Sequence, residues 1–180
     1  MNKLWTHISY MQIEKTLLRL LVNRKGTVMD ETMLARKVKF KAMRNALGLA
    51  LSNVAYMCDT SDRTVRTWES VTSKRVVPVP DRAFDLLENC YKEHLERVRF
   101  SVDKIHEIEQ KAGKKPAYVD LAYYYSQPLY RHYHRHDNGY YKIANANTLA
   151  VAAILELEGY TVNIMRAEEY YKKYTVSEFE

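Results

Sequence analysis

The chain has 180 residues, of which 47% are hydrophobic and 28% charged, and it contains only five glycines and four prolines. This composition excludes a wholly disordered chain and favours long helices around a buried core, in one domain or two small ones. The net charge of +6 is concentrated in residues 36–75, where nine Lys and Arg stand against three Asp and Glu. A basic segment of this kind suits a polyanionic partner such as nucleic acid.

The first 30 residues are expected to form an extra N-terminal helix. Residues 8–23 have the spacing of an amphipathic helix that Gly26 ends. The alternative is that the native chain starts at Met29. This segment lacks the apolar stretch of a signal peptide, and no apolar run in the sequence reaches the length of a membrane span. We therefore expect a cytoplasmic protein with no membrane partner.

The next predicted helix runs from Asp30 or Met33 to Leu47. Apolar residues repeat in it every four positions, which predicts a row that faces the core. That row consists of Leu34, Val38, Ala42 and Ala46, with Phe40, Met43 and Leu47 beside it.

Two short helices follow, over residues 51–58 and 62–70, joined by a tight turn at Asp59. Ser61 is a good N-cap for the second helix, because its hydroxyl can accept a hydrogen bond from an unpaired backbone N–H. Three residues apart in that helix, Val65 and Trp68 are expected to face inward. The opposite face is then polar and exposed, and it carries Asp62, Arg63, Arg66 and Thr67.

Such a pair of helices, the second exposed and basic, describes a helix-turn-helix. Residues 43–69 resemble the lambda-repressor-like (XRE) helix-turn-helix family in Leu47-Gly48-Leu49, in Ala55 and in Ser61-x-x-Thr64-Val65-x-x-Trp68-Glu69. Asp59 stands where the family usually has Gly, and Ala50-Leu51 where it usually has Ser or Thr followed by Gln. Because aspartate tolerates the left-handed backbone conformation, we expect the turn to be kept.

The family resemblance implies that the second helix enters the DNA major groove. Arg63 or Arg66 suits a bidentate contact with guanine, and Thr67 suits a thymine methyl group. Asp62 either accepts from cytosine or orients Arg66 one turn away; a solvated face with salt bridges is the alternative for the whole set. Ser61, just before the helix, is also an expected DNA contact. The expected phosphate contacts are Lys37, Lys41, Arg44, Lys74 and Arg75.

A long helix is predicted from a capping Asp81 to Ala112, ended by Gly113. Its apolar residues are Phe84, Leu87, Tyr91, Leu95, Val98, Val102 and Ile105. After it we expect a strand over 117–126, helices over 127–136 and 145–159, a strand over 160–166 and a helix over 167–175. The fold class is thus mainly α, with an extra helix (1–30), a helix-turn-helix domain that includes the long helix (31–112) and a small α+β dimerisation domain (116–180).

This order of elements is similar to YdiL-type regulators and anti-CRISPR-associated repressors over about residues 36–175, which implies that the tail joins two chains. The strand at 160–166 has one clear partner in the chain, and a two-stranded sheet is marginal, so we expect antiparallel pairing with a second copy. The predicted dimer contacts are Leu149, Ala152, Ala153, Leu157, Tyr160, Val162 and Ile164.

Two other patterns suggest other chemistry. His132 and His136 are four residues apart, as in some zinc sites, but a polar helix face explains them equally and we expect no metal or cofactor. The 15 tyrosines suit either stacking on single-stranded bases or packing in the core and dimer interface. No set of residues with catalytic spacing is present.

The sequence therefore predicts a sequence-specific DNA-binding transcriptional regulator that is not an enzyme. We expect a homodimeric repressor that binds an inverted repeat in its own operon. Two alternatives stay open: an antitoxin whose C-terminal domain binds a toxin, and an interaction module that keeps the helix-turn-helix without binding DNA.

Overall fold

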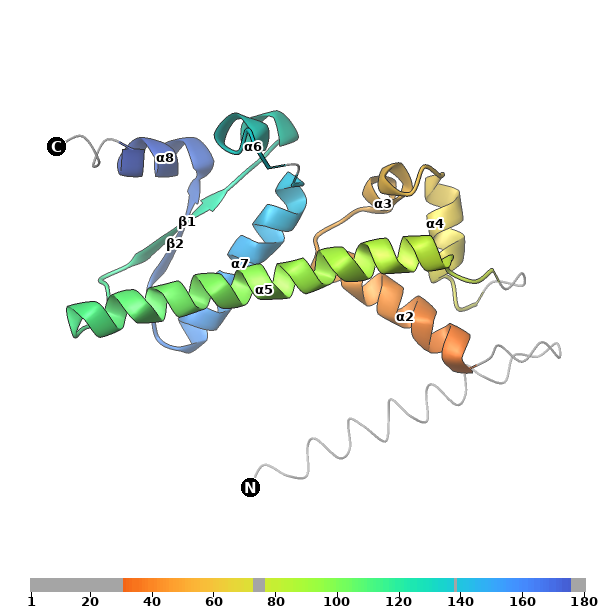
Figure 1. Ribbon diagram of the computed structural model, residues 1–180, viewed down its shortest axis with the longest axis horizontal. Coiled ribbons are helices and arrows are strands. Elements are labelled where there is room, and N and C mark those ends of the chain that lie inside the picture. Colours follow the sequence, from red (N-terminus) through yellow and green to blue (C-terminus); the bar gives the residue numbers. More distant parts are fainter. Residues whose placement is uncertain (1–30, 73–76, 138, 176–180) are drawn as a thin grey trace, which may run out of the picture.

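One long helix organises the molecule. The computed structural model describes residues 31–72, 77–137 and 139–175. In Figure 1, α5 (Asp81–Ala112) runs along the molecule with α2, α3 and α4 at one end, and with the two strands, α6 and α8 toward the other. The mainly helical fold with a small sheet is as predicted. The expected helix within residues 1–30 lies outside the described residues.

The first described helix, α2 (Glu31–Ala46), buries a different row from the predicted one. Val38, Ala42 and Ala46 are exposed. Burying the larger side chains of the neighbouring row removes more apolar area from water than burying alanines does. The buried residues repeat every three positions and are Leu34, Lys37, Phe40 and Met43.

The helix-turn-helix geometry follows the sequence closely. Helices α3 (Leu51–Met57) and α4 (Asp62–Glu69) are joined through Asp59, which has a φ of 50° and so takes the left-handed conformation that the turn requires. Val65 and Trp68 are buried, as predicted. At the start of α3, the Asn53 side chain accepts from the backbone N–H of Ala50 at 2.8 Å, which is one half of a capping box, and the Ala50 side chain offers no acceptor for the other half.

Helix α5 contributes to two separate hydrophobic clusters. Its first turns add Phe84 and Leu87 to the core of α2–α4, whereas Val98 and Val102 pack near the sheet. Its N-cap is Pro80, so Asp81 is the first helical residue and not the cap, and Gly113, with a φ of 67°, ends the helix. Leu95, predicted to be apolar and buried, is exposed, and His94 occupies the buried position.

The C-terminal part is a two-stranded sheet between helices. Strands β1 (Val119–Tyr123) and β2 (Val162–Arg166) are parallel and in register from Val119↔Val162 to Tyr123↔Arg166. Helix α7 (Tyr141–Leu157) packs on one face, and α8 (Ala167–Thr175) contacts the other through Lys173 and Asp120. The short helix α6 (Gln127–Tyr133) lies beside α8 in Figure 1. The connection through α6 and α7 brings β2 back parallel to β1, so β2 has its partner inside the chain.

Candidate nucleic-acid interface

Helix α4 is fixed at its N-terminus by its own residues. The Ser61 hydroxyl accepts from the backbone N–H of Thr64 at 3.2 Å, which confirms the predicted N-cap. The Ser61 and Thr64 hydroxyls are also 2.9 Å apart and share a hydrogen bond. Inside the unit, the Trp68 ring meets Phe40 edge to face, with ring centroids 6.2 Å apart.

A buried lysine of α2 fixes the C-terminal end of α4. Lys37 is only 1% exposed. Its Nζ donates to the carbonyl oxygens of Thr67, Trp68 and Ser70 at 3.0–3.1 Å. Burial lowers the pKa of the Lys37 ammonium below its usual value. The predicted phosphate contact of Lys37 is therefore wrong, because the side chain satisfies carbonyls that the helix end leaves without partners.

Arg44, another predicted phosphate contact, is also used internally. It forms a two-pronged ion pair with Glu69, at 2.5 Å and 2.9 Å, and donates to the Leu49 carbonyl at 2.7 Å. Both charged side chains are largely buried, so the predicted role of Arg44 is wrong as well. The sequence signal for Lys37 is its place on the three-residue row between Leu34 and Phe40; no local signal joins Arg44 to Glu69.

The outward face of α4 is exposed and carries its two arginines. Asp62, Arg63 and Arg66 are all exposed, and neither arginine forms an ion pair with any residue that the structure describes. Asp62 thus does not hold Arg66 through an ion pair. The half-buried Thr67 donates its hydroxyl to the Arg63 carbonyl at 2.8 Å, leaving its methyl group for contact. A shallow hollow of about 580 Å³ lies over this face, bordered also by Ser70.

Four of the nine basic residues in the segment are neutralised or buried within the protein. Besides Lys37 and Arg44, Arg36 pairs with Asp81 at 2.7 Å and Lys39 pairs with Glu88 at 2.6 Å. Lys41 is exposed and lies on the same row of α2 as Lys37 and Arg44, which places it beside the C-terminal end of α4. Lys74 and Arg75 lie outside the described residues. Lys41, Arg63 and Arg66 are therefore the described cations of this segment that stay free.

The predicted dimer residues divide into two groups. Ala152 and Tyr160 are buried in the chain's own cluster, so their predicted place in an interface is wrong in this fold. Val162 is half-buried against the same cluster. The exposed group consists of Leu149, Ala153, Leu157 and Ile164.

The tyrosine- and histidine-rich segment forms a packed network. The Tyr124 hydroxyl lies 2.7 Å from His134 Nε2 and 2.8 Å from the Tyr171 hydroxyl. Tyr133 stacks on Tyr171 at 4.0 Å between centroids. These side chains join α6 to α8. Among the described residues, no three His, Cys, Asp or Glu side chains are grouped as a metal site.

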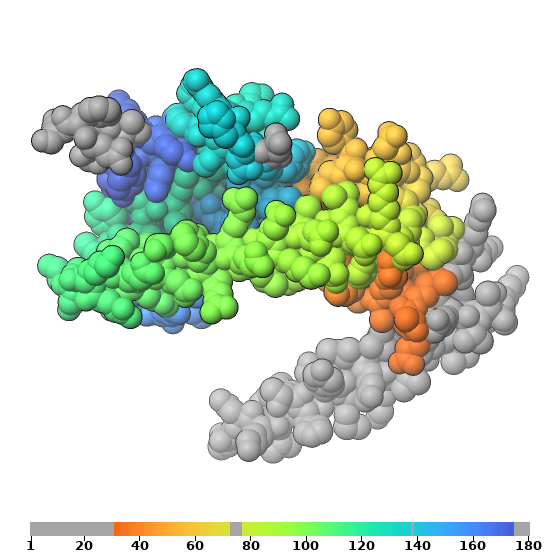
Figure 2. Space-filling view, viewed as in Figure 1, coloured from red at the N-terminus to blue at the C-terminus, as the bar shows by residue number. Residues whose placement is uncertain are grey.

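The described helices are all too short or too polar to cross a bilayer. At one end of the molecule, α3 and α4 lie far from α8, which occupies the opposite end in Figure 2.

Comparison of the chain with protein-family models and with curated proteins finds no match in either.

Proposed function

We propose that this chain is a sequence-specific DNA-binding transcriptional regulator, with α4 as its recognition helix. One observation carries the proposal: α4 is held at both ends by internal hydrogen bonds while Arg63 and Arg66 on its outer face form no ion pair with any described residue. Arginines without an ion-pair partner add little to the stability of the fold. Folding alone therefore does not explain two such residues on a helix that is held at both ends. A fixed helix with free guanidinium groups is suited to two-pronged contacts with guanine, because little order is lost on binding.

Some of the other described basic residues of 36–75 stabilise the fold, and Lys41 stays exposed, as a contact with DNA requires. Lys41 flanks the C-terminal end of α4 and is suited to a phosphate contact. We propose a cytoplasmic regulator without enzymatic activity that represses its own operon. Its affinity should fall steeply with salt, because much of the binding energy comes from counterion release.

The proposed binding unit is a homodimer on an inverted repeat. Leu149, Ala153 and Leu157 are spaced four residues apart on α7, so they form one exposed stripe. Leu149 is 50% and Leu157 89% exposed, so the stripe offers contiguous apolar surface that a second copy would remove from water. Two copies joined through this stripe would be related by a two-fold axis, which is the symmetry that half-sites about 34 Å apart require.

Fluorescence anisotropy with labelled DNA from upstream of the coding sequence tests the proposal. We expect Arg63→Ala/Arg66→Ala to lose specific binding and keep its circular dichroism spectrum. Arg99→Ala is the matched control, since Arg99 is an exposed arginine of α5 far from α4. Equal binding by wild type and double variant would refute the recognition-helix assignment.

Light scattering tests the dimer separately. The wild type should have twice the mass of one chain, and Leu149→Glu/Leu157→Glu should have the mass of one chain. Glu156→Gln, an exposed residue of the same helix, serves as the control. A wild-type mass of one chain at micromolar concentration, with tight binding to the full site, would contradict the dimer.

A further inference from the structure

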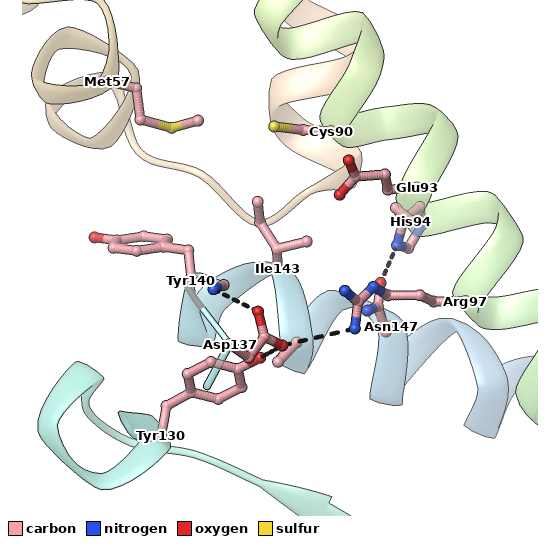
Figure 3. Close-up of a pocket in the computed structure, with 12 residues that line it drawn as sticks. Met57, Cys90, Glu93, His94, Arg97, Tyr130, Asp137, Tyr140, Ile143 and Asn147 are labelled. Atoms are coloured by element: carbon pink, nitrogen blue, oxygen red, sulfur yellow. Dashed lines mark hydrogen bonds and ion pairs between the residues drawn. The ribbon is translucent and has the colours of Figure 1, made fainter. Parts of the chain in front are cut away.

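A cavity lies where the helix-turn-helix meets the C-terminal part of the molecule. Its volume is about 330 Å³, at the small end of the range for small-molecule sites. Figure 3 shows that its walls come from the end of α3, the middle of α5, Tyr130 of α6, the segment before α7 and α7 itself. Apolar side chains form one side, and the main ones are Met57, Cys90 and Ile143.

Charged side chains form the other side of the cavity. Asp137 already accepts from the Tyr130 hydroxyl and the Gly139 N–H, both at 2.7 Å, and Arg97 lies 3.8 Å from it. Glu93, one turn before Arg97 on α5, forms no hydrogen bond or ion pair with any described residue. The lining thus carries two carboxylates and one guanidinium, so it has an excess of negative charge. The exposed carboxylate of Glu93 has no partner among the described residues.

We propose that this cavity binds a small organic cation, a primary amine attached to an aromatic or branched apolar body. The ammonium would donate to Glu93, and the body would lie against Met57 and Ile143 on the apolar side. A carboxylate ligand is disfavoured, because Glu93 and Asp137 would both repel it and the one guanidinium of the lining, Arg97, already lies 3.8 Å from Asp137. The size of the cavity restricts the ligand to a single ring or a short branched chain.

The position of the cavity connects the ligand to the DNA-binding unit. Met57 is the last residue of α3 and precedes by two residues Asp59, the left-handed residue in the turn to α4. On the opposite wall, His94 and Asn147 hydrogen-bond at 2.5 Å and join α5 to α7. A ligand that contacts both walls would therefore bias how the helix-turn-helix packs against α5. This coupling to DNA binding rests on the proposed function, whereas binding of the ligand to the cavity does not.

Calorimetric titration of the full chain with three matched probes tests the binding. Phenethylamine is the cation, phenylacetate the anion and 2-phenylethanol the neutral compound of similar size. We expect the amine to bind about threefold more tightly than the alcohol, the ratio that an ion pair with an exposed carboxylate provides, and the acid to bind least. Equal affinities for amine and acid, or no heat from any probe at millimolar concentration, would overturn the proposal.

Variants locate the site. Glu93→Gln should remove the preference for the amine over the alcohol, whereas Glu96→Gln, an exposed neighbour on α5 that does not line the cavity, should keep it. Ile143→Phe should weaken all three probes by filling the cavity, with its fold checked by circular dichroism. A preference that survives Glu93→Gln would place the amine elsewhere and refute the site.

DNA affinity is measured with and without phenethylamine in the same anisotropy assay. A shift that Glu93→Gln abolishes would support the coupling, and an unchanged affinity would refute it. A chain that binds the amine but no upstream DNA would count against the proposed function and leave the cation site standing.

Discussion

Two basic residues of α2 and two of α4 are used in opposite ways. Lys37 and Arg44 point into the protein, where they bind backbone carbonyls and a carboxylate. Arg63 and Arg66 point out and have no ion-pair partner among the described residues. Both sets contribute equally to the charge density of residues 36–75, so charge counted along the sequence does not separate the cations that hold a helix from those free to bind a ligand.

This difference has a physical basis in helix ends. The last carbonyls of a helix lack partners inside the helix, and a buried cation from a neighbouring helix can satisfy several at once. In this protein Lys37 of α2 does so for α4, whereas Arg63 and Arg66 lie on the outer face of α4. Removing Lys37 from α2 should therefore lower the stability of the protein. Removing Arg63 or Arg66 from α4 should lower DNA binding and leave the stability unchanged.

The largest effect should come from replacing Trp68, on the inward face of α4. Trp68→Ala removes the ring that packs on Phe40 and should lower the free energy of unfolding by about 3–5 kcal/mol. Urea unfolding followed by circular dichroism measures it. Tyr56→Ala is the control, because Tyr56 is an aromatic residue that is 88% exposed and should cost little. An unchanged midpoint for Trp68→Ala would reverse the assignment of the faces.

Lys37→Met should give the next largest loss of stability. It leaves three carbonyls of the α4 end without their donor, at about 1 kcal/mol or more for each. Lys41→Met removes the same charge from the exposed position on the same row, and its unfolding midpoint should match the wild type. Equal midpoints for the two variants would show that the buried ammonium contributes nothing.

On α4, single substitutions should weaken binding without unfolding the protein. Arg63→Ala or Arg66→Ala should each cost about 1–3 kcal/mol of specific DNA binding, the usual value of a bidentate guanine contact. Anisotropy with specific and scrambled DNA measures it, and thermal unfolding checks the fold. If both variants discriminate the two DNAs as well as the wild type does, these arginines do not recognise bases.

The smallest effect is expected at Lys41. Lys41→Met should weaken specific and scrambled DNA to the same extent and reduce the slope of log affinity against log salt by about 0.9, the value of one phosphate contact. The measurement is a salt titration from low to physiological ionic strength. A slope identical to that of the wild type would mean that Lys41 does not reach a phosphate.

Short-range interactions explain what can be predicted from the sequence. The Ser61 cap, the left-handed Asp59 turn and the inward pair Val65 and Trp68 each depend on contacts within a few residues, so local rules are sufficient. The exposed arginines of α4 follow from the same local spacing. The helix-turn-helix and its outer face can therefore be predicted from the order of residues within this one segment.

By itself, then, the sequence determined where the helices lie, the N-cap of α4 and its polar face, since these are set by hydrogen bonds and periodicity along the chain. Only the tertiary structure decided which cations are free, because the carbonyls that bind Lys37 are 30 or more residues away and Glu69 is 25 residues from Arg44. It also decided that β2 pairs in parallel with β1 and that Tyr160 is buried. Burial of a charged or polar side chain depends on whether distant groups satisfy it, and that depends on how the helices and strands pack.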